Sequence, residues 1–590
     1  LQKLPFPNAP SSLPPPKEWL SKLKQTLQTT SLWNDRKAMA YLLTRGCLMA
    51  ADHAVSAGVP NFKVQLPEPS MPSPRSFQKR IGEHCGDAFL EAPTGAGKTN
   101  AAVLWALRNR QSGERIFYLL PYQASIEAMA DALEEKFGKE HVAILHARAL
   151  DYAFREHFEQ TGEYKGAVSE AMAQVELNRL AHKPVKVATP FQLLKWLFGI
   201  PRFEIGISEM VGGLFIFDEI HAYDAHVVAL IAEMVRTLKQ CDGRFLFMSA
   251  TFPPFLKELL HNALGRDARE FTLSDDEADG WSQEFLRQAR HRIRWHDERL
   301  EELVPQILNA VNDGKRVLVV ANRVAQAQEI YCQLRGQLSG VHLLHSRFAR
   351  RDRVAKERAI IGALLSKNDV EVKVLVATQV VEVSLDVSFD TIFTEVAPVD
   401  DLLQRFGRVN RYGEHERGVD AHVARSFDAE QLKWVYDLER IYATLDTAPQ
   451  DGTPLTIDET VKWVHAVYQC GWTQKEKKRY EQAQGAFQQV LENLRPLQQS
   501  EEGEEEFSGL FKGVEVLPQP PYDEYQEHMN NKHYLLANQL LVPIPLGTFH
   551  MLNNDGRLCH LKEGTLLADV SYDSERGLLP KEINVDAAII

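Results

Sequence analysis

The sequence predicts an α/β protein with two parallel-sheet domains, and two observations lead to this prediction. Short apolar runs alternate with helix-like stretches between about 73 and 298, namely DAFLEAP, RIFYLLP, VKVATP, GLFIFDE and RFLFMSAT. The same alternation starts again between 316 and 398, with RVLVVAN, VHLLHS, VKVLVATQ and TIFTEVAP. Strands that alternate with helices in this way form parallel sheets whose two faces are covered by the helices.

The composition is that of a globular protein with several domains. The chain has 590 residues, 44% of them hydrophobic, and is too long for a single hydrophobic core. Its formal net charge is −13, so any contact with nucleic acid must be local. Six scattered cysteines indicate neither a disulfide framework nor a structural metal, which fits a reducing cytoplasm. No apolar run approaches the roughly 18 residues of a membrane span, so we expect no membrane contact.

Shifts in composition divide the chain into five segments. Two proline-rich stretches bracket a helical unit at the N-terminus, and an acidic run, QSEEGEEEF, interrupts the helical periodicity that follows the second set of strands. We expect this run to be a solvated linker. The expected units are a small helical N-terminal unit (1–72), a first sheet domain (73–298), a second sheet domain (299–425), a helical linker region (426–508) and a mixed C-terminal domain (509–590).

The segment EAPTGAGKTN, residues 91–100, follows the first strand-like run and leads into a good helix. Its spacing matches a phosphate-binding loop in which Ala92 replaces the first glycine. The backbone of such a loop curls around phosphate, Lys98 reaches the β and γ phosphates, and the Thr99 hydroxyl binds Mg²⁺. The alternative is a flexible glycine-rich turn. The expected ATP-binding residues here are Thr94, Gly95, Ala96, Gly97, Lys98 and Thr99.

The segment FDEIHAYDAH, residues 217–226, places two adjacent carboxylates at the end of an apolar strand. Downstream of a phosphate loop, this pattern predicts that Asp218 holds Mg²⁺ and that Glu219 orients and deprotonates the attacking water. Ligands of open α/β sheets bind at the carboxyl ends of strands, where both residues lie. A strand that merely ends on a solvated turn is the alternative.

The second sheet domain supplies QRFGRVNRYG, residues 404–413. Arg408 and Arg411 are three residues apart on a predicted helix, so we expect both on one face, pointing at the γ-phosphate across an interdomain cleft. Guanidinium groups there neutralise the charge that develops as the phosphoryl group is transferred. The alternative is a solvated basic helix. The catalytic residues are thus expected to be Lys98, Asp218, Glu219, Gln404, Arg408 and Arg411.

These segments resemble helicase motifs. DEIH, SAT (249–251) and QRFGRVNR are similar to motifs II, III and VI of superfamily 2 helicases, in which two RecA-like domains close over ATP and move along one strand. The longer DEIHAYD resembles motif II of the CRISPR-associated effector helicase of type I systems, the family usually called "Cas three". YDSERGLL near the C-terminus resembles that family's closing signature. The resemblance covers about 75–425 strongly and the tail weakly.

The resemblance implies further roles. Gln78 would read adenine, and Asp386 would lie in the cleft near the ribose or the arginines. His221, Ser249 and Thr251 would couple hydrolysis to movement, although His221 could also merely cap a turn. Single-stranded DNA would cross both domains with little sequence preference, chiefly through phosphates, against Tyr122, Gln123, Thr189, Pro190, Asn322, Arg323, His345, Arg347 and Thr378.

Two basic stretches leave their roles open. RFARRDRVAKER, 347–358, holds six Arg or Lys against two acids and is either a phosphate track or a solvated helix start. RQARHRIRWHD, 287–297, is either part of a DNA groove or a linker. We expect its His296-Asp297 pair to be structural.

The sequence departs from the resembled family at its N-terminus. Members usually carry an HD-type metal nuclease of about 200 residues there, whereas this chain has about 72 residues before the first sheet domain, with His53 as their only histidine. LTRGCLMAADHAVSAG, which contains Asp52, resembles the last helix of that nuclease. Either the chain is a fragment, which fits its start at Leu1, or it is a helicase subunit that partners a separate HD nuclease. We therefore expect no nuclease activity from this chain alone.

The expected function is that of a 3′ to 5′ single-stranded DNA translocase and helicase. The resemblance implies recruitment to an RNA-guided type I surveillance complex that has opened an R-loop. A DEAD-box RNA helicase is a rival hypothesis, disfavoured by DEIH in place of DEAD and by Gln404 at the start of the last motif. A non-catalytic scaffold is disfavoured because Lys98, Asp218, Glu219 and both arginines are intact.

Overall fold

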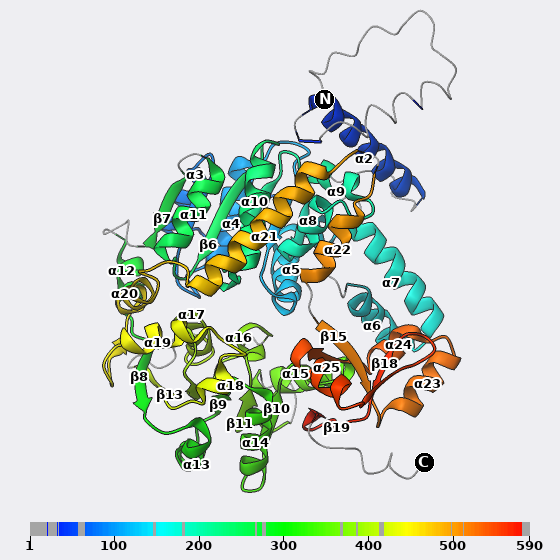
Figure 1. Cartoon of the computed structure of the whole chain (residues 1–590). Coiled ribbons are helices and arrows are strands. Elements are labelled where there is room, and N and C mark those ends of the chain that lie inside the picture. The colour runs from blue at the N-terminus through cyan, green and yellow to red at the C-terminus, as the bar shows by residue number, and fades with distance from the viewer. Residues whose placement is uncertain are drawn as a thin grey trace, which may run out of the picture.

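Two sheet domains lie one above the other, and a smaller C-terminal domain sits beside the lower one (Figure 1). The structure is a computed structural model that describes residues 21, 32–33, 35–56, 65–145, 149–179, 183–265, 268–273, 279–365, 370–384, 387–411, 418–496, 498–510 and 513–580. Asp386 lies outside these residues, and the side chain of Gln123 is not described either.

Domain 1 is built on a seven-stranded sheet whose strand order is β3-β4-β2-β5-β6-β1-β7, with every pair parallel. Most of its strands are short, buried apolar runs, whereas the edge strand β7 begins with exposed Arg269 and Glu270. The strands are β1 (Ala88–Glu91), β2 (Ile116–Leu119), β3 (Val142–Leu145), β4 (Val185–Ala188), β5 (Leu214–Phe217), β6 (Arg244–Ser249) and β7 (Arg269–Thr272).

Helices cover both faces of this sheet, as the sequence predicts. Alternate residues of β5 enter different cores: Phe215 and Phe217 pack into one, and Leu214 and Ile216 into the other. The helices of domain 1 are α3 (Ser76–Glu83), α4 (Lys98–Asn109), α5 (Gln123–Phe137), α6 (Ala149–Thr161), α7 (Tyr164–Arg179), α8 (Pro190–Leu197), α9 (Phe203–Met210), α10 (Ala225–Lys239), α11 (Pro254–Leu264) and α12 (Gly280–Arg287), with 3₁₀ turns at Lys139–His141 and Ile220–Ala222.

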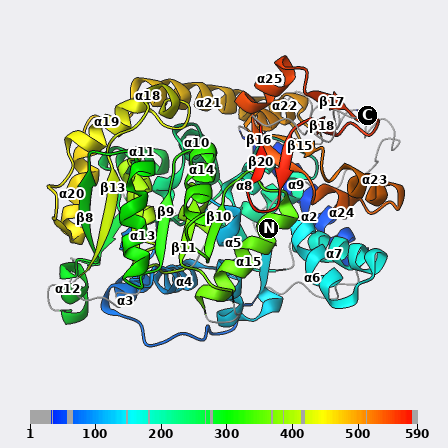
Figure 2. The same ribbon diagram turned by 90° about the horizontal axis from the view of Figure 1, so that it is seen from below.

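Domain 2 repeats the plan with the order β10-β11-β9-β12-β13-β8-β14, in which only the β8–β14 pair is antiparallel. Figure 2 shows these strands side by side from β10 to β8. They are β8 (His291–His296), β9 (Val317–Val320), β10 (Val341–Leu344), β11 (Val374–Ala377), β12 (Thr391–Glu395), β13 (Val419–Ala424) and β14 (Pro454–Leu455).

The limits of domain 2 differ from the expected 299–425. Strand β8 pairs with β13 in register from His291 to His296, so the second domain begins before residue 291. At the other end, β14 and the helices before and after it pack into the same core. The helices are α13 (Val304–Asn312), α14 (Val324–Arg335), α15 (Arg350–Leu364), α16 (Val380–Ser384), α17 (Val399–Phe406), α18 (Ala429–Leu432), α19 (Leu438–Asp446) and α20 (Ile457–Val467), with a 3₁₀ turn at Leu300–Leu303.

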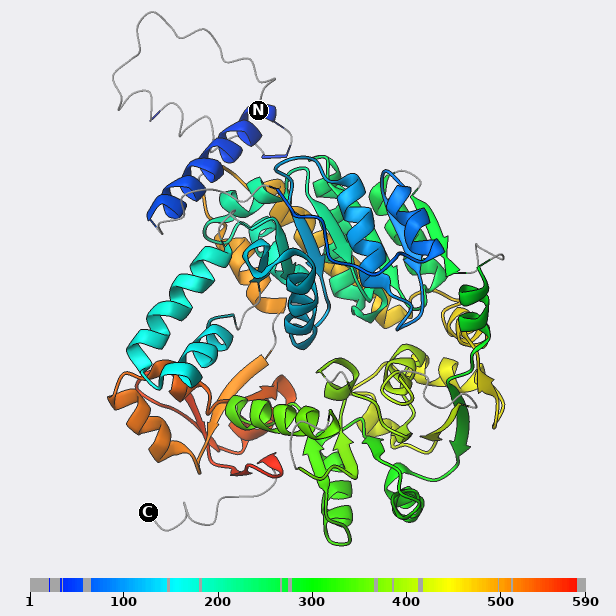
Figure 3. The same ribbon diagram turned by 180° about the vertical axis from the view of Figure 1, so that it is seen from behind.

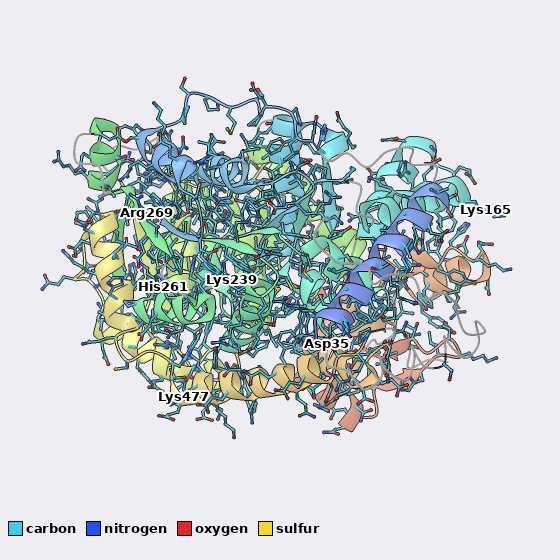
Figure 4. The ribbon with its side chains drawn as sticks, turned by 90° about the horizontal axis from the view of Figure 1, so that it is seen from above. Asp35, Lys165, Lys239, His261, Arg269 and Lys477 are labelled. Atoms are coloured by element: carbon cyan, nitrogen blue, oxygen red, sulfur yellow. The ribbon has the colours of Figure 1, made fainter. Side chains whose placement is uncertain are left out.

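Helix α21 (Gln474–Asn493) crosses back from domain 2 to pack along α10 of domain 1. Its buried stripe includes Phe487, which stacks on Phe198 with ring centroids 4.5 Å apart. Buried Glu233 on α10 accepts hydrogen bonds from Gln484 and Gln488. Figure 4 shows α21, which carries Lys477, running along one side of domain 1. The expected linker region 426–508 is therefore divided between the two sheet domains, and its acidic run begins α22 (Glu501–Leu510).

The N-terminal unit is described through α2 (Arg36–Ser56), which packs on α9. The helices approach closely because Gly46 has no side chain: a Cβ there would lie 2.2 Å from the Glu204 carbonyl oxygen. Arg45 forms an ion pair with Glu204 at 3.1 Å. Among the described helices, none is long and apolar enough to cross a membrane.

The C-terminal domain has a four-stranded sheet of order β16-β15-β18-β17 and a separate β-hairpin. Its strands are β15 (Gly513–Pro518), β16 (Val542–Pro545), β17 (Leu558–His560) and β18 (Leu566–Ala568), and its helices are α23 (Tyr522–Asn530), α24 (Tyr534–Asn538) and α25 (Leu546–Asn554). The hairpin of β19 (Ser571–Asp573) and β20 (Gly577–Leu579) contains the YDSERGLL segment.

This hairpin attaches the C-terminal domain to domain 2. The Leu578 N–H donates to the Arg347 carbonyl at 2.9 Å, and Gln328 Nε2 donates to the Arg576 carbonyl at 2.7 Å. Gly577 permits the contact, because its φ is +77° and a Cβ there would lie 2.6 Å from the Arg347 carbonyl oxygen. Fully buried His345 bonds at both ring nitrogens: Nδ1 accepts from the Arg347 N–H, so Nε2 carries the proton and donates to the Arg576 carbonyl at 2.9 Å.

His345 should make stability depend on pH. Burial lowers its pKa from 6.5 to about 3, and the positive charge of Arg347 adds to this. Between pH 6.5 and pH 3 His345 binds a proton in the unfolded chain but not in the folded one. The stability that neutral, buried His345 contributes is therefore complete above pH 6.5 and is lost as the pH falls toward 3. Between pH 7.5 and 5, the free energy of unfolding should fall by about 2 kcal/mol more in the wild type than in His345→Gln, measured by urea titration. An identical pH dependence in both proteins would show that His345 is not held neutral.

Candidate nucleotide and nucleic-acid site

A cavity of about 1520 Å³ lies between the two sheet domains. Its lining comes from both sheet domains and from Gln539 and Pro543 of the C-terminal domain, and it includes helices as well as loops that follow strands. From domain 1 the lining residues include Thr94, Thr99, Tyr122, Asp218, Glu219, His221 and Thr251, and from domain 2 Ser346, Gln379, Gln404, Arg408 and Arg411. The cavity therefore gathers residues of all three segments that the sequence predicts for ATP, whereas Gly95, Ala96, Gly97 and Lys98 of the phosphate loop are not part of its lining.

The phosphate loop joins β1 to α4 and has the predicted geometry. Gly95 and Gly97 have φ values of +84° and +93°, which strongly favour glycine. Lys98 is the first residue of α4 and is 8% exposed. Buried Gln78 on α3 donates from Nε2 to the Gly97 carbonyl at 3.0 Å, so in this nucleotide-free structure it supports the loop itself.

Lys98 forms an ion pair with Glu219, which lines the cavity, with Nζ and Oε1 2.9 Å apart. Burial opposes the charge on Lys98, but Glu219 and Asp218 outweigh it and raise the pKa of Lys98 above its usual value. Burial likewise opposes the charge on Glu219, but Lys98 outweighs it and lowers the pKa of Glu219. Glu219 also has a left-handed backbone, with φ +51° and ψ 46°, a strain typical of functional positions.

Asp218 lies deeper than Glu219 and is 6% exposed. Tyr118 donates its hydroxyl to Asp218 Oδ2 at 2.8 Å, and Tyr118 also hydrogen bonds with Thr99. Burial and the neighbouring Glu219 raise the pKa of Asp218 to about 6. The Asp218 carboxylate and the Thr99 hydroxyl are hard oxygen donors at one point beside the phosphate loop, and this donor set fits Mg²⁺.

The described residues contain no group of three or more His, Cys, Asp or Glu side chains arranged to hold a metal ion. Asp52 and His53 lie on α2, away from the cavity lining.

His221 connects three elements. Ser249 Oγ donates to the Thr251 carbonyl, so His221 Nδ1 donates to Ser249 Oγ at 2.7 Å and His221 Nε2 accepts. The group that it faces is Gln404 Nε2 of domain 2, at 3.4 Å. These contacts join the strand end after β5, the strand end after β6 and α17 of the other domain, which is the arrangement that a coupling role requires.

Arg408 and Arg411 both line the cavity, but the expectation that they share one helical face is wrong. Helix α17 ends at Phe406, and Asn410 adopts a left-handed backbone with φ +47°, because the Asn410 N–H turns back to the Phe389 carbonyl. Arg408 Nε donates to the Val381 carbonyl at 3.0 Å, so Arg408 also braces α16.

Two arginines at this site were missed by sequence reasoning. Arg290 Nη1 donates to the Thr94 carbonyl at 3.3 Å and to the Arg411 carbonyl at 3.1 Å, so it bridges the phosphate loop and the last motif. The basic run 287–297 was the available signal. Arg405, fully buried in domain 2, pairs with Glu382 at 2.8 Å and donates to Asn322 Oδ1 at 3.0 Å. Its burial inside QRFGRVNR depends on tertiary packing, which the sequence pattern does not reveal.

The residues expected at DNA lie at the ends of neighbouring strands, with different exposure. Tyr122, after β2, lines the cavity, whereas Thr189, Asn322, His345 and Thr378 are at most 5% exposed. Pro190 begins α8 and is also buried, Arg323 donates to Gln431, and Arg347 Nη2 lies 3.4 Å from Thr548 Oγ1. In this arrangement the buried members can offer a strand their backbone groups rather than their side chains.

Comparisons with known proteins agree with this architecture. Residues 75–259 match the family model described as "DEAD/DEAH box helicase" and residues 313–414 match "CRISPR-associated nuclease/helicase Cas3, C-terminal". The chain is 26% identical over 497 residues to a "Putative CRISPR-associated nuclease/helicase Cas3" of Methanocaldococcus jannaschii, which covers 82% of this chain and 66% of that protein. The chain thus spans about half to two thirds of the length of such curated relatives.

Solved structures show the same fold. "Crystal structure of T. fusca Cas3-ATP" is similar with a TM-score of 0.65 and 20% identity, covering 90% of this chain and 71% of that one. "CRISPR RNA-guided surveillance complex, pre-nicking" is similar with a TM-score of 0.56 and 19% identity, covering 86% and 70%. The two family models and the curated relatives show that the chain is related to the Cas3 family of superfamily 2 helicases and carries the sequence of an ATP-dependent helicase, and the solved structures show that it shares their fold.

Proposed function

We propose that this chain uses ATP hydrolysis to move along single-stranded DNA and to unwind the duplex ahead of it. The observation that carries the proposal is the Lys98–Glu219 ion pair, whose carboxylate lines a cavity that both sheet domains share. A lysine at a phosphate loop, a carboxylate pair opposite it and arginines from a second domain are the parts that phosphoryl transfer requires.

The ion pair suggests how nucleotide binding prepares hydrolysis. Without nucleotide, Lys98 neutralises Glu219 and holds its carboxylate. When the phosphates of ATP attract the Lys98 ammonium group, Glu219 is released and its carboxylate can accept a proton from water. Bound Mg²⁺, held by Thr99 and Asp218, would supply positive charge at the phosphates.

Gln404, Arg408 and Arg411 bring domain 2 to the same phosphates. Positive charge from the two arginines stabilises the phosphoryl group as it is transferred. The His221–Gln404 contact joins Glu219's loop to α17, so a change at the phosphates reaches domain 2 directly. Asp386, expected near the ribose, and Gln78, expected at adenine, remain predictions.

DNA binding is proposed on the strand ends beside the nucleotide site. The expected residues follow β2 and β4 in domain 1 and β9, β10 and β11 in domain 2, which are neighbours in their sheets. A strand held by backbone groups and phosphates is read without regard to base, so the sequence preference should be low. The family resemblance implies 3′ to 5′ movement.

The biological setting is proposed from the relatives. A type I RNA-guided surveillance complex would open an R-loop in the cytoplasm and recruit this chain, and an HD nuclease, as an upstream domain or a separate subunit, would cut the unwound strand. The similarity to a putative CRISPR-associated nuclease/helicase and to a structure described as a CRISPR RNA-guided surveillance complex supports this setting.

Removing Lys98 or Asp218 should abolish turnover. Lys98→Ala and Asp218→Asn should each lower the DNA-stimulated ATPase rate by roughly 10²-fold or more, because each removes charge at the reacting phosphates. The control is Lys257→Ala, which removes a cation that pairs with Glu91 and Glu270 and does not line the cavity. Near-native turnover in either variant would refute the assignment of the site.

Glu219→Gln separates binding from hydrolysis. In this variant Lys98 does not have to break an ion pair with a carboxylate before it binds phosphate, so ATP should bind as tightly as to the wild type or more tightly. The ATPase rate should nevertheless fall by roughly 10²-fold, as in the Lys98 and Asp218 variants. Equilibrium binding of a fluorescent ATP analogue and steady-state turnover measure the two effects. A variant that binds ATP weakly but turns it over normally would exclude the role given to Glu219.

The proposed function is tested by ATPase assays with single-stranded DNA and RNA and by strand displacement from 3′- and 5′-tailed duplexes. We expect stimulation by DNA and displacement from the 3′ tail. Stimulation by RNA alone would favour an RNA helicase, and displacement from the 5′ tail alone would reverse the proposed polarity.

A further inference from the structure

The three domains close into a ring. Hairpin α6–α7 of domain 1 reaches down to the C-terminal domain, and α15 of domain 2 lies between that domain and the centre (Figure 3). Tyr164 on α7 stacks against His533 with ring centroids 4.2 Å apart, and its hydroxyl accepts from the Leu535 N–H at 3.1 Å. The β19–β20 hairpin closes the other side on domain 2.

The interdomain cavity continues from the nucleotide site into this ring. Beyond Tyr122 and Ser125, its lining contains arginines of α6 and α15, namely Arg155, Arg350, Arg351, Arg353 and Arg358. Acidic side chains of the same elements and of α5 line it too, among them Glu127, Asp131, Asp151 and Glu357. This half of the cavity is therefore rich in arginine, although its charge is balanced by carboxylates.

Arg350 is where the three domains meet. Its Nη1 donates to Asp151 of domain 1 at 3.1 Å, and its Nη2 donates to Glu515 Oε2 of the C-terminal domain at 2.6 Å. Two further pairs repeat the pattern: Arg358 with Glu159 of α6 at 2.6 Å, and Arg351 with Glu524 of α23. In the basic stretch that the sequence left open, carboxylates from two other domains thus pair with Arg350, Arg351 and Arg358, although the side chains of Arg351 and Arg358 remain 48% and 58% exposed.

Arg350 retains hydrogen-bonding capacity beyond these carboxylates. Its Nε is buried and has no hydrogen-bond partner among the described residues, and the same holds for Nε of Arg347, three residues earlier in the turn before α15. An unsatisfied buried donor is unfavourable, and an additional anionic oxygen would relieve it. Planar guanidinium groups match phosphate oxygens as well as they match carboxylates.

We propose that Arg350 is a binding residue for a DNA phosphate, and that Asp151 and Glu515 occupy it in the DNA-free protein and keep the ring closed. An entering phosphate displaces the two carboxylates, which return to water. Arg350 then no longer ties α6 and β15 to α15, and contact between domain 1 and the C-terminal domain loosens as the strand enters. The inference rests on the proposed action on single-stranded DNA and adds the residues that govern entry.

Removing a carboxylate and removing Arg350 should change the affinity for single-stranded DNA in opposite directions. Asp151→Asn and Glu515→Gln should each bind a fluorescent oligothymidine about two- to five-fold more tightly than the wild type, because one competing ion pair of partly buried groups is removed. Arg350→Gln should bind several-fold more weakly, and the slope of log K against log salt should fall by about 1. Equilibrium anisotropy of the full chain at several salt concentrations, without nucleotide, gives both quantities.

Ring opening adds a second measurement. The two acid variants should associate faster with covalently closed circular single-stranded DNA, which must pass through the opened ring, and the gain should be smaller for linear DNA. The matched control is Asp420→Asn, which removes a carboxylate from Arg292 and Arg294 of domain 2 away from the cavity lining, and which should change neither measurement.

If the acid variants bind DNA no more tightly than the wild type, or weaken binding as Arg350→Gln does, these ion pairs only hold the domains together and the proposal is wrong. If single-stranded DNA does not stimulate the ATPase activity of the wild type, the proposed function itself is wrong. Stimulation in the wild type together with unchanged affinities in the acid variants would refute only this inference.

Discussion

Two parallel sheets turn the carboxyl ends of their strands toward one cavity, and every functional group described above depends on that arrangement. The sheet of domain 1 continues one residue beyond its strands: the Asp218 N–H donates to the Leu119 carbonyl and the Ala92 N–H to the Ser249 carbonyl. The register of the buried strands therefore fixes where the phosphate loop, the carboxylates and Ser249 begin. Because each strand is only a few residues long, a shift of one residue would move its functional loop out of the site.

In the ligand-free protein, carboxylates form ion pairs with positively charged side chains at both ends of the cavity. Glu219 pairs with Lys98 at the nucleotide end, and Asp151 and Glu515 pair with Arg350 at the other. Each pair lowers the cost of burying a cation where a phosphate is to bind. Each carboxylate also belongs to a different element from its cation, so displacing it changes contacts between elements. Ligand binding and domain movement are thereby linked through the same side chains.

Local patterns made the two sheets, the phosphate loop and the Asp218–Glu219 pair predictable, because a strand, a glycine-rich turn and the start of a helix follow one another in sequence. What the sequence could not predict depends on tertiary contacts. Arg290 reaches Thr94 across 196 positions, and Arg405 is buried by Glu382, Thr394 and Asn322, although it looks like any other basic residue of its motif. The helix expected to carry Arg408 and Arg411 ends at Phe406, because Val409 forms a parallel β-bridge with Phe389, just before β12. The domain boundary near 298 was misplaced because β8 pairs with a strand more than 120 residues later.

If one cavity holds ATP at one end and a DNA strand at the other, as proposed above, the two ligands must affect each other. The most direct measurement is the Kd of a non-hydrolysable ATP analogue with and without saturating oligothymidine, together with the Kd of oligothymidine with and without the analogue. The account predicts that each ligand tightens the other by the same factor, roughly five-fold or more, because both are bound by the closed pair of sheet domains. If both ligands bind and neither changes the affinity of the other, the account is contradicted.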